Sequence, residues 1–211
     1  MKYKYMLDKS VRDNIRNMNF GKTNKTWEII GDLKWEHMIP PPPENDSQFT
    51  RKEIEFMVDL TEQRDEQGDI LVKVVDEDPN NLFDPELVKK HKKEFEKAWS
   101  FVKPVIMNLK WKWNRPRPYQ LSDYFGYKIN VLSTKSHHTP AYPSGHTAWA
   151  ATMGHILESY YPNLRDQIQE KVLMAGQARV LQGVHYPSDN DASIVVAQSV
   201  WNQIYNKVIG V

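Results

Sequence analysis

Hydrophobic residues recur at helical spacing along most of the chain. After the run Pro40-Pro41-Pro42-Pro43 they fall three or four residues apart, a spacing that places them on one face of an α-helix. Strand patterns are nearly absent. The spacing predicts helices over about residues 54–61, 87–106, 147–160, 164–181 and 189–208. The sequence therefore predicts an all-α fold, a single-domain bundle of about six core helices.

Two segments fall outside this helical pattern. Residues 1–43 have no clean period and end in the four prolines, so we expect an N-terminal arm followed by a helical domain over residues 44–211. Within that domain, an apolar run at residues 70–75 precedes Asp76-Glu77-Asp78-Pro79, which is a strong loop signal. This run leaves room for a single hairpin strand.

The amino-acid composition excludes several classes of binding partner and several kinds of site. Lys and Arg number 28 against 27 Asp and Glu, and a net charge of +1 gives no global reason to bind a nucleic acid polymer or an anionic membrane. Cys is absent, which excludes disulfides, thiolate zinc sites and Cys nucleophiles. We expect no membrane span and, without a signal-peptide pattern at the N-terminus, a cytoplasmic protein. The 7 Trp and 10 Tyr suit a core or a homo-oligomer interface equally.

The first candidate motif is the basic segment 110–118, Lys-Trp-Lys-Trp-Asn-Arg-Pro-Arg-Pro. Seven residues bring Lys110 and Arg117 almost to the same side of a helix. Pro116 and Pro118 should end that helix near Asn114 or Arg115. Two cations would then face one place, although a basic helix C-terminus is also favoured by the helix dipole alone.

The second motif is Pro143-Ser144-Gly145-His146, at the start of a predicted helix. Ser144 is a natural N-cap, and the free backbone N–H groups that follow it make an anion site at the positive end of the helix dipole. Gly145 lets an anion approach the backbone closely. An ordinary capped helix start with a surface histidine would show the same pattern.

The third motif runs from Arg179 to Asp189. Arg179 falls on the apparently buried side of its helix, where a guanidinium needs an anion to offset desolvation, which is a first hint of a bound oxyanion. Ser188, with Asp191 three residues on, indicates an N-cap, which places Asp189 in the first helical turn and His185 in the loop before it. Asp189 can then orient the His185 imidazole for nucleophilic attack, or the two can form a merely structural hydrogen bond.

Together the three motifs supply three cations, one helix N-terminus and two histidines. Phosphoryl transfer needs positive charge on the equatorial oxygens, an in-line nucleophile and an acid for the leaving oxygen, and these groups suit that reaction. The motifs Lys-x6-Arg-Pro, Pro-Ser-Gly-His and Arg-x5-His-x3-Asp also resemble the signature of the type 2 phosphatidic acid phosphatase superfamily in order and spacing. That superfamily includes bacterial class A nonspecific acid phosphatases and vanadium-dependent haloperoxidases. The resemblance covers about residues 110–189, and Ala178 stands where the family usually has Ser.

The resemblance implies a role for each motif residue. His185 would attack phosphorus while Asp189 holds its tautomer, and His146 would protonate the leaving alkoxide and then activate water. No metal and no cofactor is implied. The phosphate oxygens would be held by Lys110, Arg117, Ser144, Gly145 and Arg179.

The expected function is therefore a metal-independent phosphomonoesterase acting on nucleotides or sugar phosphates through a phosphohistidine. Tyr119, Tyr142 and Tyr186 could contact a ring or a sugar of the substrate. One alternative within the superfamily is a haloperoxidase with vanadate held on His185. Another is a catalytically idle binding or assembly protein on the same scaffold.

Overall fold

The computed structural model describes residues 39–134 and 136–210, so most of the predicted arm at 1–43 lies outside the described residues. Within these ranges the chain forms helices and no strand, as the all-α prediction required. Short 3₁₀ helices occur at Pro79–Leu82, Ser122–Phe125 and Pro162–Leu164. The α-helices are α3 (Gln48–Glu62), α4 (Glu66–Glu77), α5 (Pro85–Lys90), α6 (Lys92–Trp113), α7 (Pro118–Leu121), α8 (Gly145–Tyr160), α9 (Arg165–Leu181) and α10 (Pro187–Ile209).

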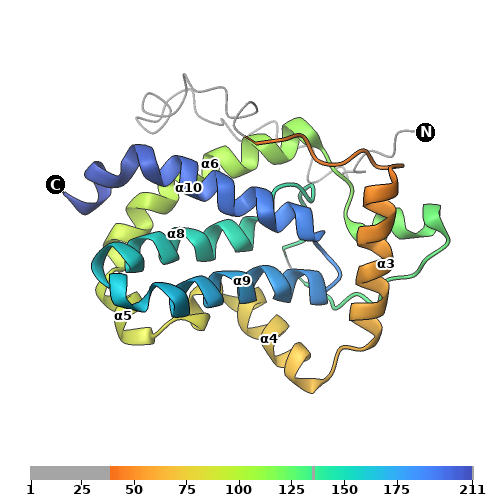
Figure 1. The fold of residues 1–211 in the computed structure, drawn as a ribbon, viewed down its shortest axis with the longest axis horizontal. Helices are drawn as coiled ribbons and strands as arrows, with labels where there is room; N and C mark the ends of the chain where they lie inside the picture. Colours follow the sequence, from red (N-terminus) through yellow and green to blue (C-terminus); the bar gives the residue numbers. More distant parts are fainter. Residues whose placement is uncertain (1–38, 135, 211) are drawn as a thin grey trace.

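Helix α8 is the centre of the bundle. It packs against α6, α9 and α10, and α4 covers a further part of α9 (Figure 1). Nearly every residue of α8 between Thr147 and Leu157 is buried. Gly154 allows α8 to approach α9 closely, because a Cβ atom there would lie 2.9 Å from Cγ2 of Val172. The burial of α8 fixes the direction in which its N-terminus points.

The apolar run at residues 70–75 is helical, so the predicted hairpin strand is wrong. Asp65 caps α4 by accepting a hydrogen bond from the backbone N–H of Gly68 at 2.9 Å. Val72 and Val75 then bury one stripe of the helix, while Ile70 remains exposed. The helix continues to Glu77 and carries Asp76, which the loop signal had placed in a turn.

The predicted helix over 87–106 is two helices. The chain breaks at His91, whose buried ring stacks on Tyr160 with centroids 4.2 Å apart and lies 3.1 Å from the Tyr161 hydroxyl. Helix α6 ends at Asn114, which adopts a left-handed conformation with φ 48°. The stop near Asn114 predicted from the following prolines is confirmed.

A smaller apolar cluster holds α3 across the end of the bundle, where it stands beside the start of α10 in Figure 1. Ile54 and Met57 of α3 pack there with Tyr186. Helix α10 begins at Pro187, with Tyr186 rather than Ser188 as its N-cap residue. The Ser188 backbone N–H instead donates to Glu53 of α3 at 2.8 Å. Among the described helices, none is long and apolar enough to cross a membrane.

Candidate active site

The starts of α8 and α10 meet and bring the second and third motifs together. The Ser144 backbone N–H donates to the Asp189 carbonyl at 3.1 Å, and the Thr147 hydroxyl donates to Asn190 Oδ1 at 2.8 Å. A cavity of about 340 Å³ opens at this junction. Its lining includes five of the predicted site residues, namely Lys110, Arg117, Gly145, His146 and His185.

His185 has the orientation that the third motif predicts. Its Nδ1 lies 3.0 Å from Oδ2 of the fully buried Asp189, so Nδ1 carries the proton and donates to the carboxylate. Nε2 is then a free acceptor, and it takes a hydrogen bond from Arg117 Nη1 at 2.7 Å. Burial lowers the pKa of His185 well below its usual value, and the charge of Arg117 acts in the same direction. The imidazole is therefore neutral, it lines the cavity, and its Nε2 lone pair accepts from Arg117.

Backbone carbonyls hold the two cations of the first motif in place. The buried Lys110 ammonium donates to the Pro140 carbonyl at 2.6 Å, and Arg117 donates to the Val184 carbonyl at 2.8 Å. Burial lowers the pKa of Lys110 well below its usual value, and the neighbouring Arg117 lowers it further. An anion in the cavity would relieve both effects, since it would supply the opposite charge that the carbonyls lack.

The Arg179 guanidinium forms an ion pair with a carboxylate of the protein itself. Its Nη1 lies 2.7 Å from Oδ1 of Asp76 on α4, and its Nη2 donates to the Ser136 hydroxyl at 3.0 Å. Burial raises the pKa of Asp76, but hydrogen bonds from Thr134 and Arg179 outweigh it and the net shift is downward. The carboxylate is therefore ionised, so a buried Arg179 does not by itself require a bound oxyanion.

His146 lies at the start of α8, within electrostatic reach of Arg179 and Asp76. Burial and the positive charge of Arg179 lower its pKa to about 3, although Asp76 acts in the opposite direction. Without an anion, His146 is neutral at ordinary pH. A dianionic phosphate beside it would favour the protonated form, so ligand and proton should arrive together.

A buried network behind the histidine was not predicted from the sequence. Arg115 donates from Nη1 to Oδ1 of Asp189 at 2.7 Å and from Nη2 to Oε2 of Glu53 at 2.8 Å. Its guanidinium also lies over the Tyr186 ring, 3.7 Å from the centroid. The network fixes the carboxylate that orients His185. Glu53 is 62 residues from Arg115, and no local pattern marks the pair.

The remaining predicted residues have other positions. Ser144 is buried and its hydroxyl accepts from the Thr147 backbone N–H at 3.4 Å, so it caps α8 as predicted. Tyr142 and Tyr186 are buried in the core rather than exposed to a substrate, which corrects their expected contact with a ring or sugar. Trp99 and Trp149 instead form an apolar wall of the cavity. Trp149 follows His146 by three residues on α8, a spacing that could have indicated a shared face.

Sequence comparison identifies relatives of this chain. The sequence model of a family described as the PAP2 superfamily matches residues 100–209. A non-specific acid phosphatase of Providencia stuartii is 35% identical in an alignment 92 residues long that covers 41% of this chain and 34% of that protein. A non-specific acid phosphatase of Salmonella typhimurium is 27% identical in an alignment 171 residues long that covers 73% of this chain and 66% of that protein. The matched parts thus span less than two thirds of either relative.

Solved structures share the fold at low sequence identity. A transmembrane PAP2-type phosphatidylglycerolphosphate phosphatase from Bacillus subtilis superposes with a TM-score of 0.56 at 14% identity, over 79% of this chain and 89% of that one. A bacterial vanadium-dependent iodoperoxidase superposes with a TM-score of 0.55 at 17% identity, over 83% of this chain and 54% of that one. Both likenesses concern the helical architecture.

Proposed function

The chain belongs to the PAP2 superfamily, and from this membership and the geometry of the site we propose that it hydrolyses small phosphate monoesters through a phosphohistidine. One observation carries the proposal. His185 is neutral and lines the cavity, its Nδ1 is held by Asp189, and its Nε2 accepts from Arg117, a second residue of the same lining. The similarity to non-specific acid phosphatases supports the same reaction.

In the first half-reaction, Nε2 of His185 attacks phosphorus and forms the N–P bond. The P–O bond to the leaving group breaks on the opposite side, and His146 gives its proton to the departing alkoxide. In the structure Arg117 donates a hydrogen bond to Nε2 of His185. This bond has to break, and Arg117 has to turn toward a phosphate oxygen, before the Nε2 lone pair can attack phosphorus. The alcohol leaves, and the phosphate stays on His185.

In the second half-reaction, the neutral His146 takes a proton from water while the water oxygen attacks phosphorus. The N–P bond breaks, its electron pair returns to Nε2, and inorganic phosphate is released. Asp189 stabilises the imidazole while it carries phosphate, because its carboxylate keeps the Nδ1 proton in place. His146 ends the cycle protonated, ready for the next ester.

Positive charge stabilises the equatorial oxygens in both steps. Lys110 and Arg117 line the cavity, and the α8 backbone N–H groups begin at Gly145. Arg179, which is paired with Asp76, reaches the cavity lining through its hydrogen bond to Ser136. These groups supply the charge that Mg²⁺ provides in kinases, so the proposed mechanism uses no metal. The proposed substrates are nucleotides or sugar phosphates.

The test is phosphate release from phenyl phosphate and a panel of sugar and nucleoside phosphates, with a chelator present. We expect His185→Ala to lose at least about a thousandfold in kcat. His138→Ala is the matched control, because His138 is an exposed loop histidine. Orthovanadate, which imitates the pentacoordinate phosphorus, should inhibit the native protein. Activity of His185→Ala within about tenfold of the native protein would overturn the phosphohistidine route.

A further inference from the structure

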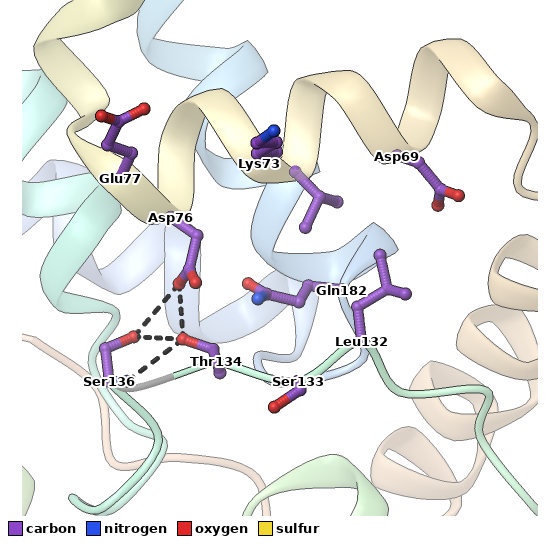
Figure 2. A pocket seen from close by; sticks show the side chains of 10 residues that line it. Asp69, Lys73, Asp76, Glu77, Leu132, Ser133, Thr134, Ser136 and Gln182 are labelled. Atoms are coloured by element: carbon purple, nitrogen blue, oxygen red, sulfur yellow. Dashed lines mark hydrogen bonds between the residues drawn. The ribbon is translucent and has the colours of Figure 1, made fainter.

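A second cavity adjoins the one that contains His185. It has a volume of about 680 Å³, within the roughly 300–1,000 Å³ of small-molecule sites, and lies between α4 and the segment around Thr134 (Figure 2). Glu77 and Ser136 line both cavities. The two spaces therefore meet at these two residues.

Gln182 lies at the base of the second cavity with an unsatisfied amide. Its side chain is 1% exposed, and neither Oε1 nor Nε2 has a hydrogen-bond partner among the described residues. Figure 2 shows the amide in the space between α4 and Thr134, beside Asp76. Buried amides are normally paired, because desolvation without a partner costs free energy. An unpaired donor and acceptor in a cavity point to a ligand that offers both.

Three carboxylates and one Lys line this cavity, and two of the carboxylates are paired with arginines outside the lining. Asp76 pairs with Arg179 at 2.7 Å, and Asp69 pairs with Arg64 at 2.7 Å. Lys73 and Glu77 contribute one charge of each sign from the same helix. This lining offers a second phosphate no net positive charge, and the described residues include no group of three or more His, Asp or Glu side chains that could hold a metal ion. The lining favours an uncharged ligand with many hydrogen-bonding groups, and sugar hydroxyls both donate and accept.

The position of the cavity fits the leaving group of the proposed reaction. In-line attack from His185 places the departing oxygen on the opposite side of phosphorus, where His146 protonates it. His146 lines the first cavity together with Glu77 and Ser136, and these last two residues also line the second cavity. A leaving group that extends past Ser136 and Glu77 would therefore enter this space.

We propose that the second cavity binds the sugar, or another polyol, of the phosphoester while the phosphate lies at His185. This inference rests on the proposed function, because the phosphate position sets where the leaving group goes. Gln182 then acts as a specificity residue that recognises hydroxyl groups. It touches the leaving group and takes no part in the transfer of phosphorus.

The test compares glucose 6-phosphate with cyclohexylmethyl phosphate, which has a ring of the same size without hydroxyls. The measured quantity is kcat/KM for glucose 6-phosphate divided by kcat/KM for cyclohexylmethyl phosphate. In Gln182→Leu this ratio should fall about five- to tenfold, mainly through a higher KM for the sugar ester, because one pair of neutral hydrogen bonds is lost. Leu removes the unsatisfied amide and leaves an apolar side chain in its place, so the fold should be retained.

Gln177→Leu is the matched control, since Gln177 lies on α9, the helix that Gln182 caps at its C-terminus, and lines a different cavity. Its ratio should remain within about twofold of the native value. An active Gln182→Leu protein with the native ratio would overturn the sugar site and leave the phosphatase proposal standing. Cleavage of phenyl phosphate without cleavage of glucose 6-phosphate would overturn it as well. A native protein that cleaves none of these esters would overturn both proposals.

Discussion

The buried Arg115 network makes a sharp prediction about stability. Arg115 is fully buried and pairs with Glu53 at 2.8 Å and with Asp189 at 2.7 Å, and both carboxylates are almost completely buried. Arg115→Met keeps an unbranched apolar stem but leaves two carboxylates without their cation. Removing one partner of a buried ion pair costs about 3–5 kcal/mol. We therefore expect the free energy of unfolding to fall by about that amount.

Such a loss is large for a protein of this size. Natural domains have only about 5–15 kcal/mol of stability, and each kcal/mol corresponds to about 2–4 °C in Tm for a chain of 150–250 residues. The Tm of Arg115→Met should fall by about 6–20 °C. Arg51→Met is the matched control, because Arg51 pairs with Glu55 on the surface at 2.9 Å with both side chains about half exposed. It should cost about 0.2–1 kcal/mol.

Urea unfolding of the single and double variants tests the physical reason for the loss. Glu53→Gln should cost less in the Arg115→Met background than in the native protein, because it removes a charge that has already lost its partner. We expect a coupling energy of about 0.5–3 kcal/mol between the two substitutions. Costs that add to within about 0.5 kcal/mol would refute the argument that the pair acts as a unit.

Three further predictions address backbone strain and protonation. Gly183→Ala should cost about 1–3 kcal/mol in urea unfolding, more than Gly210→Ala, because both have φ near +80° but only at Gly183 would a Cβ meet a neighbour, Ile129, at 2.8 Å. Burial lowers the pKa of His155 to about 4, so below about pH 6.5 the unfolded chain binds a proton at this position that the folded protein does not. The free energy of unfolding therefore falls as the pH drops from about 6.5 toward 4, by about 2 kcal/mol at about pH 5. An equal loss of stability between pH 7 and 5 in His155→Leu would contradict this reasoning. We expect the protein to take up a proton when it binds sulfate at about pH 5, because the anion raises the pKa of His146, which is about 3 without it. Calorimetry in buffers of different ionisation enthalpy measures this uptake, which should be absent in His146→Gln.

Local signals in the sequence were sufficient for most of the fold. Helical periodicity located all the long helices that follow α4, and the prolines after Asn114 marked the end of α6. The resemblance to the type 2 phosphatidic acid phosphatase superfamily is confirmed by the family match over residues 100–209. Each motif lies at a helix end, where a few neighbouring residues determine the backbone, and this is why their local geometry could be predicted.

Contacts between distant segments were not predictable from local patterns. The apolar run in α4 is short and nearly continuous, so its pattern left a hairpin strand possible, and only packing on α9 decides which of its residues are buried. Asp76 reaches Arg179 across 103 residues, and Tyr186 differs from a binding tyrosine only in its burial. The roles of the site residues, the division at residue 43, the cytoplasmic location and any homo-oligomer stay predictions.

The backbone bond between Ser144 and Asp189 has a consequence for how this scaffold could change over evolution. It joins the start of α8, which carries His146, to the start of α10, which His185 precedes by two residues. The spacing of the two histidines is therefore set by fully buried residues of the bundle. The walls of the second cavity, which we propose to hold the leaving group, come from other parts of the chain, including α4 and the segment near Ser136. Mutations there can alter substrate range while the reacting pair keeps its spacing. An experimenter who wants a new specificity should therefore randomise α4 first.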